Sequence, residues 1–288
     1  MDFVTLANEQ LSLTLSPMGA EMQALTTRDG REWLWDGNPE FWTGRAPVLF
    51  PMVGRAPEDQ VRIEGRSFGM GQHGFARRSL FEVMKADQDS CRFALVDSAP
   101  TRQVYPFAFR LVVEYRLDGN AVAVTAEVSN RDERPMPFGF GFHPAFRWPL
   151  PGAAGKKHLV RLDNRGEPAM RRLEGGLVKP EVLASPFRDG EVELEHAMFD
   201  ADAMVFPQGA GAGARLVGGE TTVHVRWENL PNFALWSKPG EAPFVCLEPW
   251  HGTAVELGGS DALEERPYGM VLEAGGVMRF GMRIELVG

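Results

Sequence analysis

Residues 137–146 alternate phenylalanines with glycines up to a single histidine, His143, which Pro144 follows. A period of two is typical of a β-strand, and it places the phenylalanines on one face and the glycines with His143 on the other. Glycine in a strand often marks the close approach of a ligand or another backbone. Pro144 ends the pairing. We therefore expect His143 at a strand end with room beside its imidazole. The alternative is a packed strand whose histidine is merely hydrogen-bonded.

A carboxylate ends a second apolar segment. In residues 244–250, Glu248 follows Phe-Val-Cys-Leu and precedes Pro249 and Trp250. Partial desolvation there raises the pKa of the carboxyl group, which makes it a better general base near neutral pH. Cys246 shares the face of Glu248 but has no activating partner, so we expect a small core residue. A carboxylate and an imidazole together suit acid–base chemistry.

Two further segments carry arginines. In residues 72–78, glycines surround His73 and Arg77 follows four positions later, which suits a loop that presents an imidazole and a guanidinium to an oxygen-rich ligand. The alternative is a surface loop with an incidental histidine. Residues 49–55 form an apolar run that ends in Arg55, which is either a binding arginine or a solvated residue at a strand end.

Short strands must position these residues. Residues 109–117 and 122–128 both alternate, and Asp-Gly-Asn between them predicts a long antiparallel hairpin. Further strands are expected near 11–15, 22–25, 33–35, 61–63, 67–68, 221–227, 233–236, 244–248 and 277–286, and one helical turn within 261–266. Many short antiparallel strands predict an all-β sandwich or closed sheet. We expect one domain over residues 1–288, with the small-residue stretch 209–214 as a loop.

The composition of the chain disfavours several classes of binding partner. The net charge of -9 disfavours nucleic acid and anionic membrane surfaces. Two cysteines, Cys91 and Cys246, are too few for a disulfide framework or a zinc cage. No signal-peptide pattern opens the sequence, and no apolar run approaches the ~18 residues of a membrane span. We expect a soluble cytoplasmic protein that is a monomer or a weak homodimer.

The order of these motifs resembles the aldose 1-epimerase (galactose mutarotase) family. Gly-Arg at 54–55 is followed by His-Gly-Phe-Ala-Arg at 73–77, Gly-Phe-His-Pro-Ala-Phe at 141–146 and Glu-Pro-Trp at 248–250. Gly-Ala-Glu at 19–21 and Trp-Leu-Trp-Asp-Gly at 33–37 extend the similarity through most of the chain. It is strongest to the LacX-like and hexose-6-phosphate epimerase branches. The resemblance implies a β-supersandwich with the sugar in a cleft across one sheet.

The resemblance also implies a role for each candidate. Glu248 matches the general base that takes the proton of the anomeric hydroxyl, and His143 matches the general acid that protonates the ring oxygen so that the hemiacetal opens. Rotation about C1–C2 and reclosure give the other anomer. His73, Arg55 and Asp202 match substrate-binding residues of the family. Asp200 is close enough to Asp202 in the sequence that either could be the sugar-binding aspartate. Trp236 is either a platform for the sugar or a core residue.

Two departures concern the substrate. Galactose mutarotases usually carry Asn-Arg shortly after Gly-Arg, where this chain has Ala-Pro-Glu-Asp at 56–59, and their first histidine is typically followed by two glycines. Free galactose is therefore in doubt. Arg55 and Arg77 could instead bind a 6-phosphate, because guanidinium groups match phosphate oxygens in bidentate fashion. The expected ligand is a small sugar or a sugar phosphate.

Two other classes of function stay open. A non-catalytic carbohydrate-binding protein can use the same scaffold, although binding alone does not need both Glu248 and His143. A metal-dependent cupin-like enzyme needs closely spaced histidines, whereas His73, His143 and His251 are scattered. Because ring opening involves neither redox chemistry nor group transfer, we expect no cofactor and no metal. His158, His196 and His224 have no supporting motif and are expected at the surface or in the core; His251 adjoins Trp250 and could edge the cleft.

Overall fold

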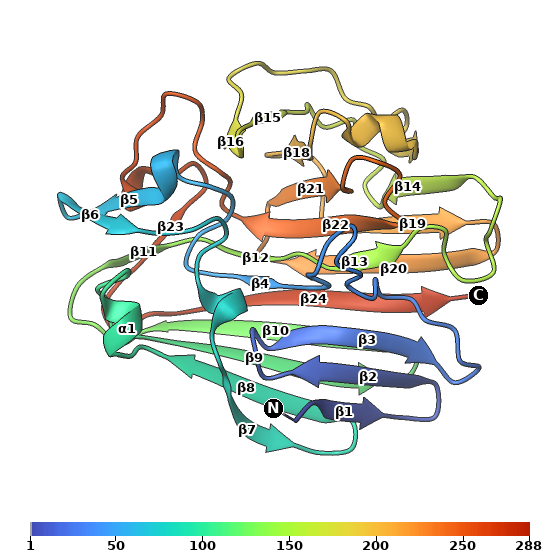
Figure 1. Ribbon diagram of the computed structural model, residues 1–288, viewed down its shortest axis with the longest axis horizontal. Coiled ribbons are helices and arrows are strands. Elements are labelled where there is room, and N and C mark those ends of the chain that lie inside the picture. Colours follow the sequence, from blue (N-terminus) through green and yellow to red (C-terminus); the bar gives the residue numbers. More distant parts are fainter. Residues whose placement is uncertain (1) are drawn as a thin grey trace.

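The computed structural model describes residues 2–288, which form an almost entirely β structure (Figure 1). Every ladder between named strands is antiparallel. The helices are short: α1 (Ala99–Arg102) and the 3₁₀ turns η1 (Pro57–Asp59), η2 (Ala76–Arg78), η3 (His196–Phe199) and η4 (Leu263–Glu265). The all-β prediction is confirmed, and η4 falls within the one helical turn predicted.

The largest sheet has nine strands. Their order across the sheet is β17 (Glu191–Glu193), β14 (His158–Leu162), β19 (Gly213–Gly218), β20 (Thr221–Glu228), β24 (Val277–Val287), β10 (Ala121–Asn130), β9 (Phe109–Asp118), β8 (Ser90–Val96) and β7 (Glu82–Ala86). The predicted hairpin is part of this sheet: β9 and β10 are neighbours and pair from Asp118 opposite Ala121 to Phe109 opposite Asn130.

A second sheet of six strands lies beside the first and carries the site. Its order is β18 (Met204–Phe206), β21 (Asn232–Trp236), β22 (Phe244–His251), β12 (Phe140–Phe142) and β4 (Val48–Leu49), and β13 (Ala145–Arg147) also pairs with β22. The strand β22 is longer than predicted. It is buried over seven consecutive residues, as expected for a strand covered on both faces.

Smaller sheets complete the fold. One has three strands, β1 (Val4–Ala7), β2 (Leu11–Ser16) and β3 (Glu21–Thr27), and Figure 1 draws them in blue near β8 to β10. Three more are pairs: β5 (Gln60–Ile63) with β6 (Arg66–Gly69), β11 (Met136–Phe138) with β23 (Met270–Leu272), and β15 (Leu173–Glu174) with β16 (Leu177–Val178). The pair β5–β6 is the predicted short hairpin.

One apolar cluster runs from Leu6 to Leu286 and holds the sheets together. Alternate residues of β9 and β10 enter it, as the period of two in the sequence predicts. Among residues 2–288, none of the helices has the length and apolar character that crossing a bilayer would require.

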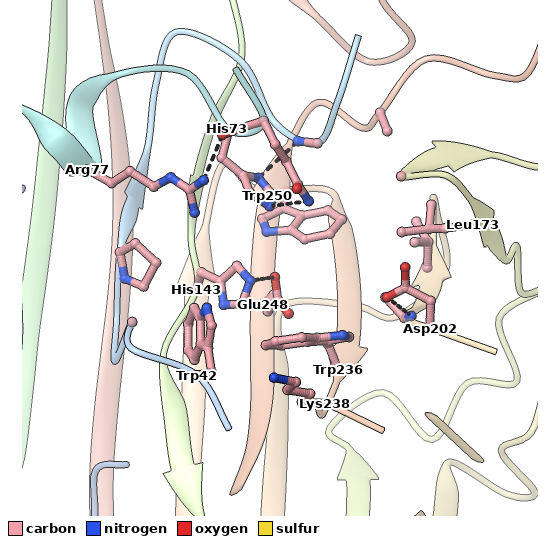
Figure 2. Close-up of a pocket in the computed structure, with 18 of the residues that line it drawn as sticks. Trp42, His73, Arg77, His143, Leu173, Asp202, Trp236, Lys238, Glu248 and Trp250 are labelled. Carbon is pink, nitrogen blue, oxygen red and sulfur yellow. Dashed lines mark hydrogen bonds and ion pairs between the residues drawn. The ribbon is translucent and has the colours of Figure 1, made fainter. Parts of the chain in front are cut away.

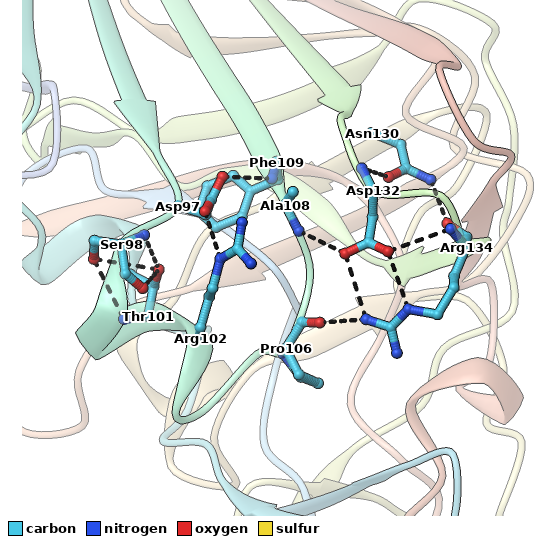
Figure 3. Close-up of polar contacts among 10 residues, drawn as sticks. All are labelled: Asp97, Ser98, Thr101, Arg102, Pro106, Ala108, Phe109, Asn130, Asp132 and Arg134. Carbon is cyan, nitrogen blue, oxygen red and sulfur yellow. Dashed lines mark hydrogen bonds and ion pairs between the residues drawn. The ribbon is translucent and has the colours of Figure 1, made fainter.

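Polar side chains fix the long connection from β8 to β9 (Figure 3). Asp97 accepts a hydrogen bond from the backbone N–H of Phe109 at 3.2 Å, and Asp132 accepts one from that of Ala108 at 3.0 Å. Arg134 binds Asp132 and donates to the carbonyl of Pro106 at 2.6 Å. This arginine thus secures a loop, and none of its partners lines the cavity described below.

Candidate active site

Strand pairing on both sides of His143 places it opposite Glu248. Gly141 of β12 pairs with Trp250, and Ala145 of β13 pairs two positions before Glu248 on the same strand β22. When this register continues across the break between β12 and β13, His143 comes level with Glu248. Its Nε2 lies 3.0 Å from Oε2 of Glu248. The predicted strand-end position of His143 is confirmed.

Both members of this pair are deeply buried. Glu248 is 1% exposed and His143 is 6% exposed. Burial, followed by the charge of Asp202, raises the pKa of Glu248 well above its usual range. Burial also lowers the pKa of His143 to about 3. The contact is not aligned as a hydrogen bond, so within residues 2–288 Oε2 of Glu248 has no hydrogen-bond donor.

The pair opens onto a cavity of about 620 Å³ (Figure 2). Its polar and charged lining comes from several elements and consists of Glu21, Thr43, Gln72, His73, Arg77, Arg78, His143, Asp202, Lys238 and Glu248. Its aromatic lining consists of Phe41, Trp42, Trp236 and Trp250. A cavity of mixed aromatic and polar character suits a small polyhydroxylated ligand.

Three tryptophans surround the pair formed by His143 and Glu248. Trp42 lies 5.1 Å and Trp236 lies 5.8 Å from the ring of His143, centroid to centroid. On the other side, a Cβ at Gly141 would lie 2.5 Å from the indole of Trp250. The space over Gly141 is therefore filled by this indole, which is the close approach that glycine in a strand permits, and the room expected beside the imidazole is the cavity that His143 lines.

His73 comes from the loop between β6 and η2. It is 6% exposed, its φ of 65° is in the left-handed region, and its ring stands perpendicular to that of His143 at 5.6 Å. Its Nδ1 accepts the backbone N–H of Gly54 at 3.0 Å, and the backbone N–H of His73 donates to the carbonyl of Gly54 at 2.8 Å. Backbone strain of this kind is common at functional sites.

Asp202 and Trp236 line the cavity on the side away from His73 (Figure 2). Asp202 has a φ of 65° just before β18, and its Oδ1 accepts the N–H of Ala203. Asp200 lines only a smaller neighbouring cavity of about 350 Å³. Of the two aspartates that competed for one role, Asp202 is therefore the one that shares a cavity with Glu248.

The two predicted arginines lie in different surroundings. Arg77 lines the cavity, points toward the two histidines in Figure 2 and donates to the carbonyl of Gln72 at 3.0 Å. Arg55 is not part of the lining. It forms a bidentate ion pair with Asp59, with both N–O distances 2.8 Å, and also donates to the carbonyl of Gly175.

The remaining histidines and both cysteines lie outside the lining. His158 is buried and accepts the N–H of Leu150, and His251 contacts the carbonyl of Asn229. Cys91 and Cys246 are free and buried. Cys246 nevertheless lies near His143 and Glu248: one ligand atom of each of the three residues lies within 4.8 Å of the others.

Sequence reasoning missed several lining residues. Trp42 comes from a segment without regular structure, about a hundred positions before His143, and belongs to no motif. Lys238 lies in the turn after β21, where a lysine is normally a solvated residue. Arg78 stands within the recognised segment 72–78, so its adjacency to Arg77 was the signal that could have identified it.

The comparisons with known proteins agree with this geometry. The family model described as aldose 1-epimerase matches residues 2–282. Two LacX proteins of Lactococcus lactis subsp. lactis, chromosomal and plasmid, are each 29% identical over 278 residues, which is 92% of both chains. The structure of a galactose mutarotase related enzyme from Lactobacillus acidophilus superposes with a TM-score of 0.92 at 29% identity, covering 100% of this chain and 98% of that one. A galactose mutarotase-like protein from Lactobacillus casei has a TM-score of 0.91 at 27% identity, covering 99% and 100%.

Proposed function

The chain belongs to the aldose 1-epimerase family and is an isomerase of the mutarotase type; we propose that it interconverts the α and β anomers of a hexose, with Glu248 as general base and His143 as general acid. The observation that carries these roles is the 3.0 Å contact between Nε2 of His143 and Oε2 of Glu248 in the wall of the cavity. A base and an acid that meet in one buried place can serve the two oxygens of a hemiacetal.

The reaction balances with protein groups alone. Glu248 as carboxylate takes the proton of the anomeric hydroxyl while His143 as imidazolium donates its proton to the ring oxygen. The bond between C1 and the ring oxygen breaks, and C1 becomes an aldehyde. After rotation about C1–C2, the ring oxygen attacks the other face of C1. His143 then takes its proton back, and Glu248 returns a proton to O1.

Other lining residues support binding of the sugar. His73 faces the cavity beside His143, and Asp202 offers a carboxylate oxygen to hydroxyl groups from the far side. Trp236 presents an indole on which the apolar face of a hexose can pack. We therefore assign these three residues to substrate binding.

The direct test is anomer exchange measured by NMR, or polarimetry that starts from pure α-anomers of several hexoses. The proposal requires exchange clearly faster than in buffer alone, and Glu248→Gln serves as the control. If the protein binds a hexose, as seen by titration, but leaves the exchange rate unchanged, it is a carbohydrate-binding protein instead.

A second candidate substrate is a hexose 6-phosphate. Arg77, Arg78 and Lys238 all line the cavity, and none has a carboxylate within 4 Å among residues 2–288. Burial and the charge of Arg78 lower the pKa of Arg77 to about 10, and Glu21 only partly offsets this. A phosphate would supply the missing counter-charge through charge-assisted hydrogen bonds. Because Arg55 is held by Asp59, the pair Arg77–Arg78 replaces the predicted pair Arg55–Arg77 in this candidate.

A further inference from the structure

Arg266 is a buried cation that the proposed reaction does not use. It follows η4 and is only 7% exposed. Within residues 2–288 no carboxylate lies in ion-pair contact with it, and its Nη1 has no hydrogen-bond acceptor. Burying a charge without a counter-ion is costly. Stability therefore offers little reason for a cation here, so a role at the neighbouring site is the better explanation.

The guanidinium joins two loops. Its Nη2 donates to the carbonyls of Val53 at 2.7 Å, Thr253 at 3.1 Å and Arg55 at 3.3 Å. The backbone N–H of Thr253 donates in return to the carbonyl of Pro267, next to Arg266. Segments 53–55 and 253–254, which are far apart in sequence, are thus held together by one charged donor.

Gly54 lies between the two carbonyls of segment 53–55 that Arg266 binds. Its φ is 70°, and a Cβ at this position would lie 2.5 Å from the Cβ of Ala254. The loop is therefore seated directly on segment 253–254, where only glycine fits. Gly54, fixed in this way, donates its backbone N–H to Nδ1 of His73 and accepts the backbone N–H of His73 at its carbonyl oxygen.

This contact determines the tautomer of His73. A backbone N–H can only donate, so Nδ1 must be an acceptor and the neutral ring carries its proton on Nε2. Nε2 also lies 3.3 Å from the amide nitrogen of Gln72, so this tautomer requires the amide group to be turned over, with its oxygen facing Nε2–H. His73, which lines the cavity, is then a hydrogen-bond donor to the ligand.

From this chain of contacts we propose that Arg266 is a positioning residue that fixes Gly54 and thereby holds His73 as a neutral donor through Nε2–H. The inference rests on the proposed function of His73 in sugar binding. The electrostatic surroundings of His73 also favour its neutral form. Burial comes first among the causes that lower the pKa of His73, followed by His143, Arg77, Arg266 and Arg78, so the ring stays neutral.

The tautomer can be measured directly by NMR on protein labelled with ¹⁵N-histidine. The chain has six histidines, and the His73→Asn variant identifies the signals of His73. In the parent, Nε2 of His73 should carry the proton. In Arg266→Met we expect a second population, protonated on Nδ1 or on both nitrogens, because the Gly54 donor is no longer fixed. Arg266→Lys keeps a charged donor and should keep most of the parental tautomer. Arg134→Met, which releases an arginine from a carbonyl elsewhere, should leave these signals unchanged.

The NMR result does not require epimerase activity, so it separates failure of this inference from failure of the proposed function. Parental His73 signals in folded Arg266→Met overturn the inference. If that variant does not fold, Arg266→Lys decides: because a single ammonium replaces the guanidinium, a minor second tautomer beside the parental one supports the inference, and signals identical to those of the parent contradict it.

Kinetics supply an independent readout once epimerase activity is established. Arg266→Met should raise KM about tenfold, as expected when a hydrogen bond to the substrate is lost, and should change kcat less. In a His73→Asn background the same substitution should have little further effect, because the residue through which it acts is gone. Equal effects of Arg266→Met in both backgrounds would mean that it acts by another route.

Discussion

His143 and Glu248 face each other from paired strands with Nε2 and Oε2 3.0 Å apart. Burial raises the pKa of Glu248 and lowers that of His143, so it favours the carboxylic acid beside the neutral imidazole in the free protein. In the proposed mechanism, transfer of the carboxyl proton of Glu248 to His143 would create the base and the acid that ring opening requires. The substrate's hydroxyl group and ring oxygen can stabilise the charged form, and no proton from solvent is needed.

The first prediction is that Glu248→Gln abolishes anomer exchange without unfolding the protein. The amide keeps the shape of the side chain but cannot take a proton, so kcat should fall roughly 10²-fold or more. NMR exchange at saturating hexose gives the rate, and circular dichroism checks the fold. Activity close to that of the parent would place the base at another residue.

The same variant should be more stable than the parent at high pH. Because the pKa of Glu248 is raised in the folded state, the favourable contribution of its neutral form is lost as pH rises from the usual value of 4.5 through the raised pKa. Glutamine has no such dependence. The difference in denaturation midpoint between Glu248→Gln and the parent should therefore be small near pH 4.5 and should grow with pH. A difference that does not change with pH would show that the carboxyl group is not perturbed by burial.

Local patterns in the sequence predicted much of the fold. Alternation over 109–117 and 122–128 predicted β9 and β10 because one face of each strand meets the core. His143 and Glu248 could be identified because each ends an apolar run beside a proline. Their 3.0 Å contact depends on the register of β12 and β13 on β22, which no local pattern specifies.

Contacts that depend on tertiary packing could not be predicted from the sequence. Arg55 and Asp59 stand four positions apart in a turn, but only the backbone conformation there decides that they pair with each other. Trp42 reaches His143 from a segment without regular structure. Arg266 is linked to His73 through Gly54, so three separate segments must meet before the relationship exists.

A pair of variants, His143→Asn and His73→Asn, should distinguish the roles of the two histidines. If His143 is the general acid, His143→Asn should mainly lower kcat, by roughly 10²-fold or more. His73→Asn removes a contact to the bound sugar, so KM should rise about tenfold while kcat changes less. Steady-state kinetics over a range of hexose concentrations distinguishes the two outcomes. Equal effects of both substitutions on both constants would contradict separate roles.

Chelation should leave the activity unchanged. The proton transfers assigned to Glu248 and His143 need no metal ion. The one group of possible metal ligands that residues 2–288 offer, His143 with Cys246 and Glu248, contains both residues of the proposed acid–base pair. A bound ion would occupy the acid and the base and should inhibit. The assay is anomer exchange before and after treatment with EDTA, with Cys246→Ala as a control that removes one ligand. Loss of activity that added metal restores would contradict cofactor independence.

The last prediction is that Arg77, and not Arg55, determines any preference for a phosphorylated sugar. Arg77 lines the cavity without a carboxylate partner, whereas the guanidinium of Arg55 is already bound by Asp59 through two 2.8 Å contacts. A charge-assisted hydrogen bond contributes about 1.5–3 kcal/mol, so Arg77→Ala should lower kcat/KM for glucose 6-phosphate by roughly 10- to 100-fold. It should affect glucose much less, and Arg55→Ala should affect neither sugar strongly.

The measurement compares kcat/KM for glucose 6-phosphate and glucose in the parent and in both variants. A parent without preference for the phosphorylated sugar would eliminate the second candidate substrate. A preference that survives Arg77→Ala but is lost in Arg55→Ala would mean that substrate displaces Asp59 from Arg55. That outcome would restore Arg55 to the binding site, because a phosphate dianion can compete with one carboxylate for a partly exposed guanidinium.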